Sequence, residues 1–193
     1  MVRGGGRPRG QAVPDDFYER IRERLRRRIA ERLRFAGRVL DIGCGSCELA
    51  CFLAEQNGQD VIGVDVSNAG FAVGEALARR VECHKADARH LDFLEDESVD
   101  AVVSVHALHE MGEPLEVLKE ARRTLRPGGV ALVVDFPRDS LAQRLWNEGY
   151  FSATEVAEML ERAGLSEVKS RLIERQQLIW AEGRKPGEGE SNR

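Results

Sequence analysis

The chain has 193 residues, of which 42% are hydrophobic and 32% charged, and its net charge is −4. This length and composition predict one globular domain that can bury a full core. No apolar run approaches the roughly 18 residues of a membrane span. The amino-terminal residues lack an apolar segment, so we expect no secretory signal and a cytoplasmic location.

The first part of the chain is basic. Residues 1–34 contain eleven arginines and five acidic residues. Residues 1–14 are rich in glycine and arginine, which predicts a flexible basic tail. An amino-terminal helix is expected over residues 15–36, because apolar side chains recur every fourth position from Phe17 to Leu33. We expect this apolar stripe to pack on the main domain, with the arginines on the solvated faces.

From residue 38 onward, strand-like and helical patterns alternate. The strand-like runs are 38–42, 60–65, 81–86, 99–105 and 129–135, and helical patterns lie at 47–57, 68–80 and 114–126. A capping box at 152–155 opens another helix, which Gly164 closes. Two last runs, 166–171 and 174–182, are expected to pair as an antiparallel edge. The pattern predicts a single domain over residues 15–182 with a parallel sheet covered on both faces, followed by a disordered tail at 183–193.

Residues 39–47, VLDIGCGSC, form the most informative motif. Two apolar residues lead into Asp41, and Gly43 and Gly45 then mark a strand-to-helix turn where a ligand can lie against bare backbone. Asp65 ends the next strand about 20 residues after Gly45, the spacing at which nucleotide-binding α/β units present an acid to a ribose diol. The motif therefore predicts an adenosine-containing ligand.

Two acidic residues narrow the choice of ligand. A dinucleotide-binding turn has a small residue where this chain has Glu48. Asp41 adds a second carboxylate where a pyrophosphate would sit, which disfavours a nicotinamide cofactor. A carboxylate at this place suits an amino acid joined to adenosine, because its ammonium group is positive.

In these features the chain resembles the class I S-adenosylmethionine-dependent methyltransferases. The resemblance covers residues 37 to about 136 and rests on five motifs in the family's order, at 39–45, 61–65, 85–88, 100–105 and 125–130. It implies a Rossmann-like α/β fold with a seven-stranded, mostly parallel sheet, an antiparallel edge strand and helices on both faces. It also implies S-adenosylmethionine as the cofactor and methyl transfer as the activity. The family often has a third glycine at the position of Cys47.

The resemblance implies a role for each motif in binding S-adenosylmethionine. Asp65 would accept hydrogen bonds from the ribose hydroxyls, and Val66 would pack on the adenine. Asp87, with the backbone of Ala88, would hold the adenine amino group, and Asp41 would order the aminoacyl end. The expected cofactor-binding residues are Asp41, Gly43, Cys44, Gly45, Asp65, Val66, Asp87, Ala88 and Val105.

Two histidines follow the fourth strand, next to where the methyl group should lie. Methyl transfer is an in-line displacement and needs a base only when the acceptor must lose a proton. His106 and His109 are the candidate catalytic residues, with His106 the better base and a structural role as the alternative for His109. Trp146, Tyr150 and Phe151 either line an acceptor pocket or cap the core.

A small molecule is the expected acceptor, because we expect no appended recognition domain. An RNA or protein acceptor bound by the basic helix is an alternative. A methyltransferase-like module that binds the cofactor and acts as a partner or scaffold is another. No membrane partner is expected, and the sequence predicts no oligomeric state.

The four cysteines are expected to be thiols, since we expect no secretory signal. The spacing of Cys44, Cys47 and Cys51 invites a metal interpretation. Structural zinc usually has two separated ligand pairs, whereas Cys47 and Cys51 lie four apart on a predicted helix and fit a buried apolar face. We therefore expect no metal.

Overall fold

Seven strands form one sheet in the computed structural model, which describes residues 13–187. In chain order, β1 to β7 span Arg38–Ile42, Asp60–Asp65, Val81–Lys85, Val99–Val105, Leu125–Asp135, Ser166–Ile173 and Leu178–Arg184. Their order across the sheet is β3-β2-β1-β4-β5-β7-β6. Strands β1 to β5 are parallel, while β7 pairs antiparallel with both β5 and β6. The predicted seven-stranded, mostly parallel sheet with an antiparallel edge is confirmed.

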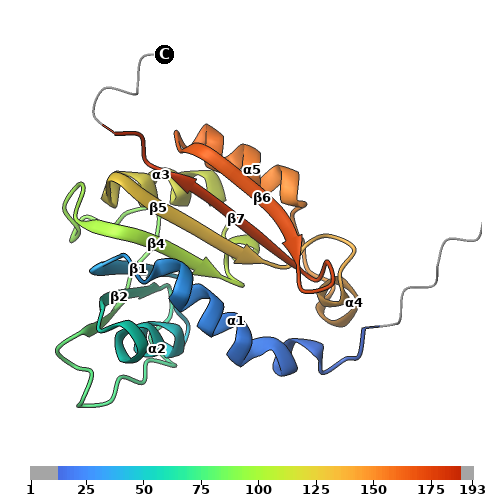
Figure 1. The fold of residues 1–193 in the computed structure, drawn as a ribbon, viewed down its shortest axis with the longest axis horizontal. Coiled ribbons are helices and arrows are strands. Elements are labelled where there is room, and N and C mark those ends of the chain that lie inside the picture. The colour runs from blue at the N-terminus through green and yellow to red at the C-terminus, as the bar shows by residue number, and fades with distance from the viewer. Residues whose placement is uncertain (1–12, 188–193) are drawn as a thin grey trace, which may run out of the picture.

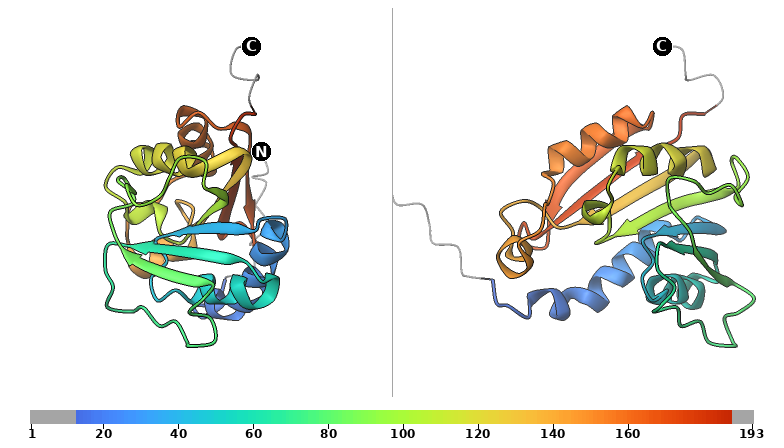
Figure 2. Two further views of the ribbon diagram at one scale, coloured as in Figure 1. Left: turned by 90° about the vertical axis from the view of Figure 1, so that its left-hand side faces the viewer. Right: turned by 180° about the vertical axis from the view of Figure 1, so that it is seen from behind.

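Helices cover both faces of this sheet (Figures 1 and 2). The helices are α1 (Phe17–Leu33), α2 (Glu48–Asn57), α3 (Pro114–Thr124), α4 (Leu141–Trp146) and α5 (Ala153–Arg162), with a 3-10 turn, η1 (Leu108–Glu110). α1 and α2 share one apolar core with the sheet, and α3 and α5 share the other. None of the described helices is long and apolar enough to cross a membrane.

Alternate residues of each strand supply these two cores. Val39 of β1 packs on the side of α1 and α2, whereas its neighbour Leu40 packs on the side of α3 and α5. Successive side chains of a strand point to opposite faces. A strand covered on both sides is therefore apolar along most of its length, as residues 99–105 are.

The apolar stripe predicted on the amino-terminal helix is buried in α1, at Phe17, Ile21, Leu25, Ile29 and Leu33. The helix is shorter than the predicted 15–36. It ends at Leu33, whose carbonyl accepts a hydrogen bond from the Ala36 N–H at 2.9 Å, so the chain turns there toward β1. Residues 1–12 of the predicted tail lie outside the described residues.

The helix predicted over residues 68–80 is wrong. The segment forms successive turns, with hydrogen bonds from Leu77 N–H to Gly74 O and from Arg80 N–H to Leu77 O at 2.9 and 2.8 Å. Gly70 and Gly74 each disfavour a helix by about 1 kcal/mol. The apolar side chains of the segment, Phe71, Val73 and Leu77, still pack against the core, so their spacing reflects burial without a helix.

The last two strands pair antiparallel as predicted, but the second begins at Leu178 and not at residue 174, because residues 174–177 form the turn between β6 and β7. Ser152 and Glu155 make the full capping box of α5, and Gly164 follows the helix with φ of 87°. β7 runs to Arg184, two residues into the segment expected to be a tail, because Lys185 and Gly129 continue the backbone pairing with β5 at 2.9 Å. Residues 188–193 of that expected tail lie outside the described residues.

The expectation of four thiols is wrong for two of the cysteines. Cys47, at the start of α2, and Cys83, on β3, form a disulfide, while Cys44 and Cys51 are free. The two bonded residues are 36 positions apart, and the parallel pairing of β1 with β2 and of β2 with β3 brings their segments together. No local pattern in the sequence could have indicated this pair.

Candidate active site

Two cavities lie next to each other at the carboxyl ends of the parallel strands. One, the α1 cavity, has a volume of about 470 Å³ and is bordered by α1. The other, the β2 cavity, has a volume of about 430 Å³ and is bordered by the residues after β2 and β3. Gly43, Gly45 and His106 line both cavities. They lie beside β1 and β4, the switch point at which open α/β sheets bind ligands.

The turn between β1 and α2 depends on its two glycines. Gly43 and Gly45 have φ of 73° and 52°, in the left-handed region that favours glycine. A Cβ at Gly43 would lie 2.3 Å from the Cβ of Ala107, whereas a Cβ at Gly45 would meet nothing within 4 Å. Gly43 thus permits close packing against the loop after β4, and Gly45 leaves bare backbone beside open space.

Asp65 lies at the end of β2 and lines the β2 cavity. Its Oδ2 accepts a hydrogen bond from the Gly45 N–H at 2.9 Å, and its Oδ1 accepts one from the Ser67 N–H at 3.0 Å. These bonds hold the carboxylate against the glycine turn and leave acceptor capacity for a diol. The next residue, Val66, is 73% exposed at the same cavity, where a flat ring could cover it.

Asp87, after β3, is held by Arg89. The guanidinium donates to both carboxylate oxygens, with 2.6 Å between Arg89 Nη2 and Asp87 Oδ2, and these side-chain bonds lower the pKa of Asp87 to about 2. Arg89 also pairs with Glu113 and so joins the two sides of the β2 cavity. Asp87 and Ala88 line this cavity. Sequence reasoning missed the bridge from Arg89 to Glu113, because no short-range pattern links these residues.

Asp41 is a buried carboxylate with an unsatisfied oxygen. Its side chain lies at a wall of the α1 cavity, only 2% of the residue is exposed, and Oδ2 has no hydrogen-bond partner among the described residues. Burial, and then the charge of Asp65, raises the pKa of Asp41 to about 7. Such a group is costly unless a cation or hydrogen-bond donor pairs with it.

His106 lies at the boundary between the cavities. Its backbone has φ of 55°, and its ring stacks on Phe136 with 4.2 Å between the ring centroids. The Nε2 atom is shielded from solvent and has no partner among the described residues. Burial lowers the pKa of His106 to about 4, so the ring is neutral at physiological pH.

His109 is placed differently. Its Nδ1 lies 2.7 Å from Asp135 Oδ1, and its Nε2 lies 3.0 Å from Glu148 Oε2. Burial would lower the pKa of His109, but the hydrogen bond and charge of Asp135 outweigh it and raise that pKa. Both ring nitrogens of His109 thus have carboxylate partners, and His109 lines neither cavity. It connects β5 to the segment after α4.

One wall of the α1 cavity is apolar and aromatic. Tyr18 and Leu25 come from α1, Phe136 follows β5, and Trp146 ends α4. The ring centroid of Tyr18 lies 4.8 Å from that of Phe136 and 5.5 Å from that of Trp146. Val105 also lines this cavity. Sequence reasoning missed Tyr18 and Phe136, although Phe136 directly follows a strand at the ligand-binding edge.

The sequence left open whether Trp146, Tyr150 and Phe151 line an acceptor pocket or cap the core, and the three residues have different surroundings in the structure. Trp146 is 48% exposed and lines the α1 cavity. Tyr150 is buried, with its ring 4.7 Å from that of His109, and Phe151 packs against the core shared with α3 and α5. Only Trp146 of the three therefore faces a possible acceptor.

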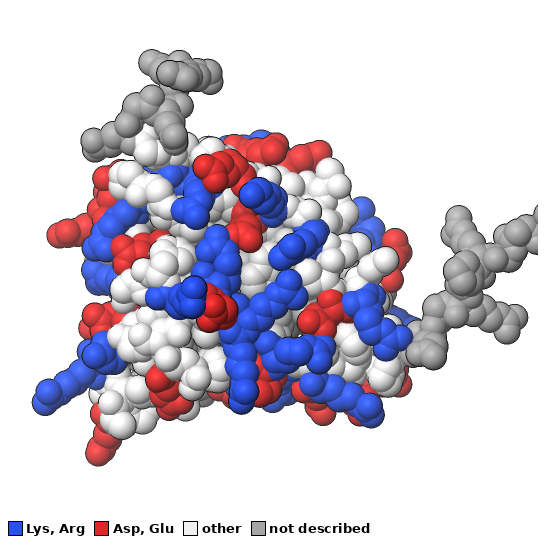
Figure 3. Space-filling view, in the orientation of Figure 1, with Lys and Arg blue, Asp and Glu red and all other residues white. Residues whose placement is uncertain are grey.

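Basic side chains are numerous on the face that carries α1, where acidic side chains lie among them (Figure 3). Several α1 arginines have acidic partners from distant segments: Arg24 pairs with Glu174, Arg26 with Glu48 and Arg32 with Glu182. These contacts tie α1 to the rest of the domain. They also reduce the positive charge that the helix can offer to a polyanion.

Known proteins share both sequence and fold with this chain. The methyltransferase domain family matches residues 40–133. Methyltransferase GfsG of Streptomyces halstedii is 35% identical over 121 residues, which cover 58% of this chain and 43% of that protein. The 27-O-demethylrifamycin SV methyltransferase of Amycolatopsis mediterranei is 36% identical over 110 residues, covering 54% of this chain and 40% of that protein. The chain spans less than half the length of these two relatives.

A solved structure extends the likeness to the fold. The cyclase SpnF superposes with a TM-score of 0.72 and 23% identity, over 86% of this chain and 82% of that chain. The matched family covers the glycine turn, β2 and the strands around the switch point, which line the β2 cavity and one side of the α1 cavity, whereas α1, Phe136 and Trp146 lie outside the match. Residues 40–133 thus belong to the methyltransferase domain family, and the relatives and the fold support the class I S-adenosylmethionine-dependent methyltransferases as the family of the chain.

Proposed function

We propose that this protein transfers a methyl group from S-adenosylmethionine to a small-molecule acceptor. The observation that carries the proposal is the unpartnered oxygen of Asp41 at the wall of the α1 cavity. The ammonium group of the cofactor would pair with this carboxylate and offset the cost of burying it. A pyrophosphate would instead add negative charge beside Asp41 and Asp65, which disfavours a nicotinamide cofactor.

The two cavities suit the two halves of this cofactor. In the β2 cavity, Asp65 would accept hydrogen bonds from the ribose hydroxyls, and Val66 would cover one face of the adenine. Asp87 and Ala88 would lie at the edge of the adenine, with Asp87 shared between the ligand and Arg89. The backbone of Gly43, Cys44 and Gly45, with Asp41 and Val105, would hold the aminoacyl end.

S-adenosylmethionine supplies an electrophilic methyl group on a sulfonium. The chain aligns the acceptor and excludes water, and His106 takes up the acceptor's proton. A neutral imidazole with a pKa of about 4 is a weak base. It suffices for a hydroxyl acceptor, because the oxygen becomes strongly acidic as its bond to carbon forms. His109 would act only as a positioning residue.

The acceptor side of the site favours a small apolar or aromatic molecule. The wall formed by Tyr18, Leu25, Phe136 and Trp146 offers apolar area and flat rings. Two relatives are named as methyltransferases, one of them for 27-O-demethylrifamycin SV. The acidic partners of the α1 arginines weaken the alternative of an RNA acceptor.

A second candidate is a domain that binds the cofactor without methyl transfer. The observation that favours it is the fold shared with SpnF, which is named as a cyclase. Incubating the protein with methyl-labelled S-adenosylmethionine and fractionated cell extract separates the two. Label that moves into a small-molecule fraction supports methyl transfer, and its absence in every fraction, despite cofactor binding, supports the non-transferring domain.

Calorimetry with S-adenosylmethionine and its demethylated product tests the cofactor site. Asp65→Asn should weaken binding by roughly 10- to 100-fold, because hydrogen bonds to a charged group contribute about 1.5–3 kcal/mol. Asp60→Asn is the matched control, since Asp60 begins the same strand at its other end and pairs with Arg80. Equal losses in both variants, or no binding to folded wild-type protein at high micromolar concentration, would contradict the proposal.

A further inference from the structure

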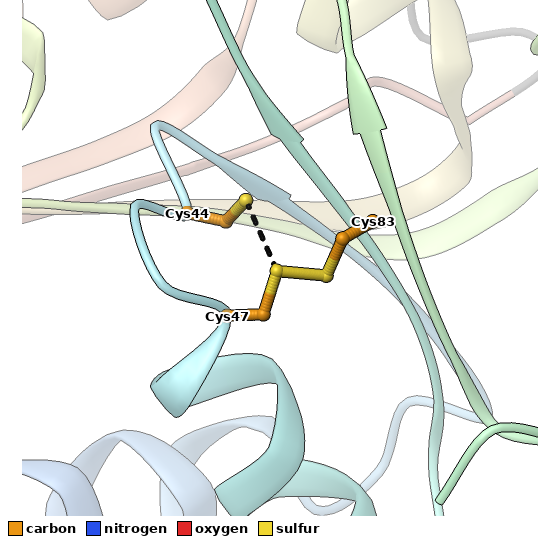
Figure 4. A group of neighbouring side chains, drawn as sticks. All are labelled: Cys44, Cys47 and Cys83. Carbon is orange, nitrogen blue, oxygen red and sulfur yellow. Dashed lines mark hydrogen bonds between the residues drawn. A yellow bond between two sulfur atoms is a disulfide. The ribbon is translucent and has the colours of Figure 1, made fainter. Parts of the chain in front are cut away.

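Three cysteine sulfurs meet behind the glycine turn (Figure 4). Cys44 comes from the turn after β1, Cys47 from the start of α2 and Cys83 from β3. The Sγ atoms of Cys44 and Cys47 are 3.7 Å apart, Cys47 and Cys83 are joined as a disulfide, and all three sulfurs lie within 4.8 Å of one another. Cys51, the fourth cysteine, is not part of this cluster.

The sheet leaves room for this cluster at Gly63. This residue of β2 pairs in register with Cys83. A Cβ at Gly63 would lie 2.9 Å from the sulfur of Cys44 and 3.1 Å from that of Cys83. Any side chain at this position would therefore push two of the three sulfurs apart. Glycine, which has no side chain, preserves the cluster.

Cys47 occupies a position that suits glycine better than cysteine. Its φ of 64° and ψ of 16° are left-handed, a conformation that costs a residue with a Cβ roughly 1 kcal/mol or more. The residue is also completely buried. A cysteine held here against its local preference indicates a use for the sulfur that glycine could not provide.

We propose that, once the disulfide is reduced, Cys44, Cys47 and Cys83 bind one copper(I) ion as a trithiolate. Three sulfurs evenly spaced about an ion at a bond length of ~2.3 Å are about 4 Å apart, close to the 3.7 Å between Cys44 and Cys47. Among the described residues, the cluster includes no fourth histidine, cysteine or carboxylate donor. Zinc prefers four ligands, whereas a soft monovalent ion accepts three thiolates.

The surroundings of the cluster are buried. Cys47 is completely enclosed and Cys44 is 9% exposed, and Cys83 packs partly buried against the same apolar core. An ion bound here would displace the protons of the three thiols and hold the sulfurs as thiolates.

The chemistry balances with a phosphine as the reductant. The phosphine and one water convert the disulfide of Cys47 and Cys83 into two thiols, and the phosphine leaves as its oxide. One copper(I) ion then replaces the three thiol protons, which are released to solvent. This proposal does not depend on the methyl-transfer function, since it concerns side chains behind the cofactor turn.

The test is a titration of the full chain, reduced with a phosphine and desalted under anaerobic conditions. Copper(I) chloride is added in competition with a coloured copper(I) chelator. We expect one ion per chain, release of three protons and a thiolate-to-copper charge-transfer band. Binding of less than one ion per chain, or tighter binding of zinc(II) in a parallel titration, would overturn the assignment.

Variants identify the ligands. Cys47→Gly should lose at least about 100-fold in copper affinity yet fold well, because glycine favours this backbone conformation. Cys83→Ser should lose a similar amount. Cys51→Ser is the control and should bind as the wild type does, because its sulfur points to Ala72 O at 3.9 Å. Unchanged binding in Cys47→Gly, with its fold verified by circular dichroism, or an equal loss in Cys51→Ser, would refute the proposal.

Discussion

Replacing Asp41 with asparagine should stabilise the protein at neutral and alkaline pH while weakening cofactor binding. The carboxylate is buried, its Oδ2 has no partner among the described residues, and its pKa is raised to about 7. In the unfolded chain an aspartate has a pKa of about 3.9. The folded state therefore holds this proton more tightly, so stability is greatest below about pH 4 and falls as pH rises toward 7.

The size of the effect follows from the two pKa values. A rise of the pKa of Asp41 from 3.8 to about 7 corresponds to about 4 kcal/mol of stability lost above pH 7. Between the two pKa values, roughly 1.4 kcal/mol is lost per pH unit. The substituted asparagine would carry no charge, but its amide group would need partners, at a cost of about 1–3 kcal/mol. Asp41→Asn should thus gain roughly 1–3 kcal/mol at pH 8 and lose stability at pH 4.

Urea unfolding of both proteins from pH 4 to pH 8 measures this difference. Other groups titrate in the same range, so the informative quantity is the variant's free energy of unfolding minus that of the wild type at each pH. This difference should rise with pH and level off above 7. A difference that stays constant across the range would show that Asp41 is not buried as a costly carboxylate. Calorimetry at pH 8 should show weaker binding of S-adenosylmethionine to Asp41→Asn.

Three further changes test other parts of the structure. His106→Asn should slow methyl transfer by about 100- to 10,000-fold while calorimetry shows unchanged cofactor binding. At saturating S-adenosylmethionine, where the titration of Asp41 no longer limits binding, wild-type activity should not fall between pH 8 and pH 6, since the pKa of His106 is about 4. Ser152→Ala removes the capping box with Glu155 and should lower the free energy of unfolding in urea by about 1 kcal/mol. Gly164→Ala should cost about 1–2 kcal/mol in the same assay, because its φ is 87° and a Cβ would lie 2.9 Å from Arg122 Nε. An Ala variant at either position with wild-type stability would contradict the local geometry.

Features set by neighbouring residues could be predicted from the sequence. The strands at 38–42, 60–65 and 99–105 were expected from their apolar runs, and β1, β2 and β4 have these bounds. The helix expected at 68–80 shows where this reasoning fails. Its apolar spacing reflects packing against the core, while Gly70 and Gly74 favour turns.

The candidate site could be predicted only in part. The acids and glycines after the strands were expected to bind one cofactor, and they do meet, because parallel strands end at one edge of the sheet; Asp65 and Gly45 are hydrogen-bonded there. The opposite environments of His106 and His109 could not be predicted. The two residues are three positions apart, and their surroundings come from β5 and the segment after α4.

By itself, the sequence determined the alternation of strands and helices, the glycine turn and the acids at the strand ends, because these depend on residues a few positions apart. The tertiary structure alone decided which distant side chains meet. The disulfide of Cys47 and Cys83, the bridge from Arg89 to Glu113 and the unpartnered oxygen of Asp41 all depend on strand register and helix packing. Those contacts depend on the packing of the whole core, so no short segment of the sequence could predict them.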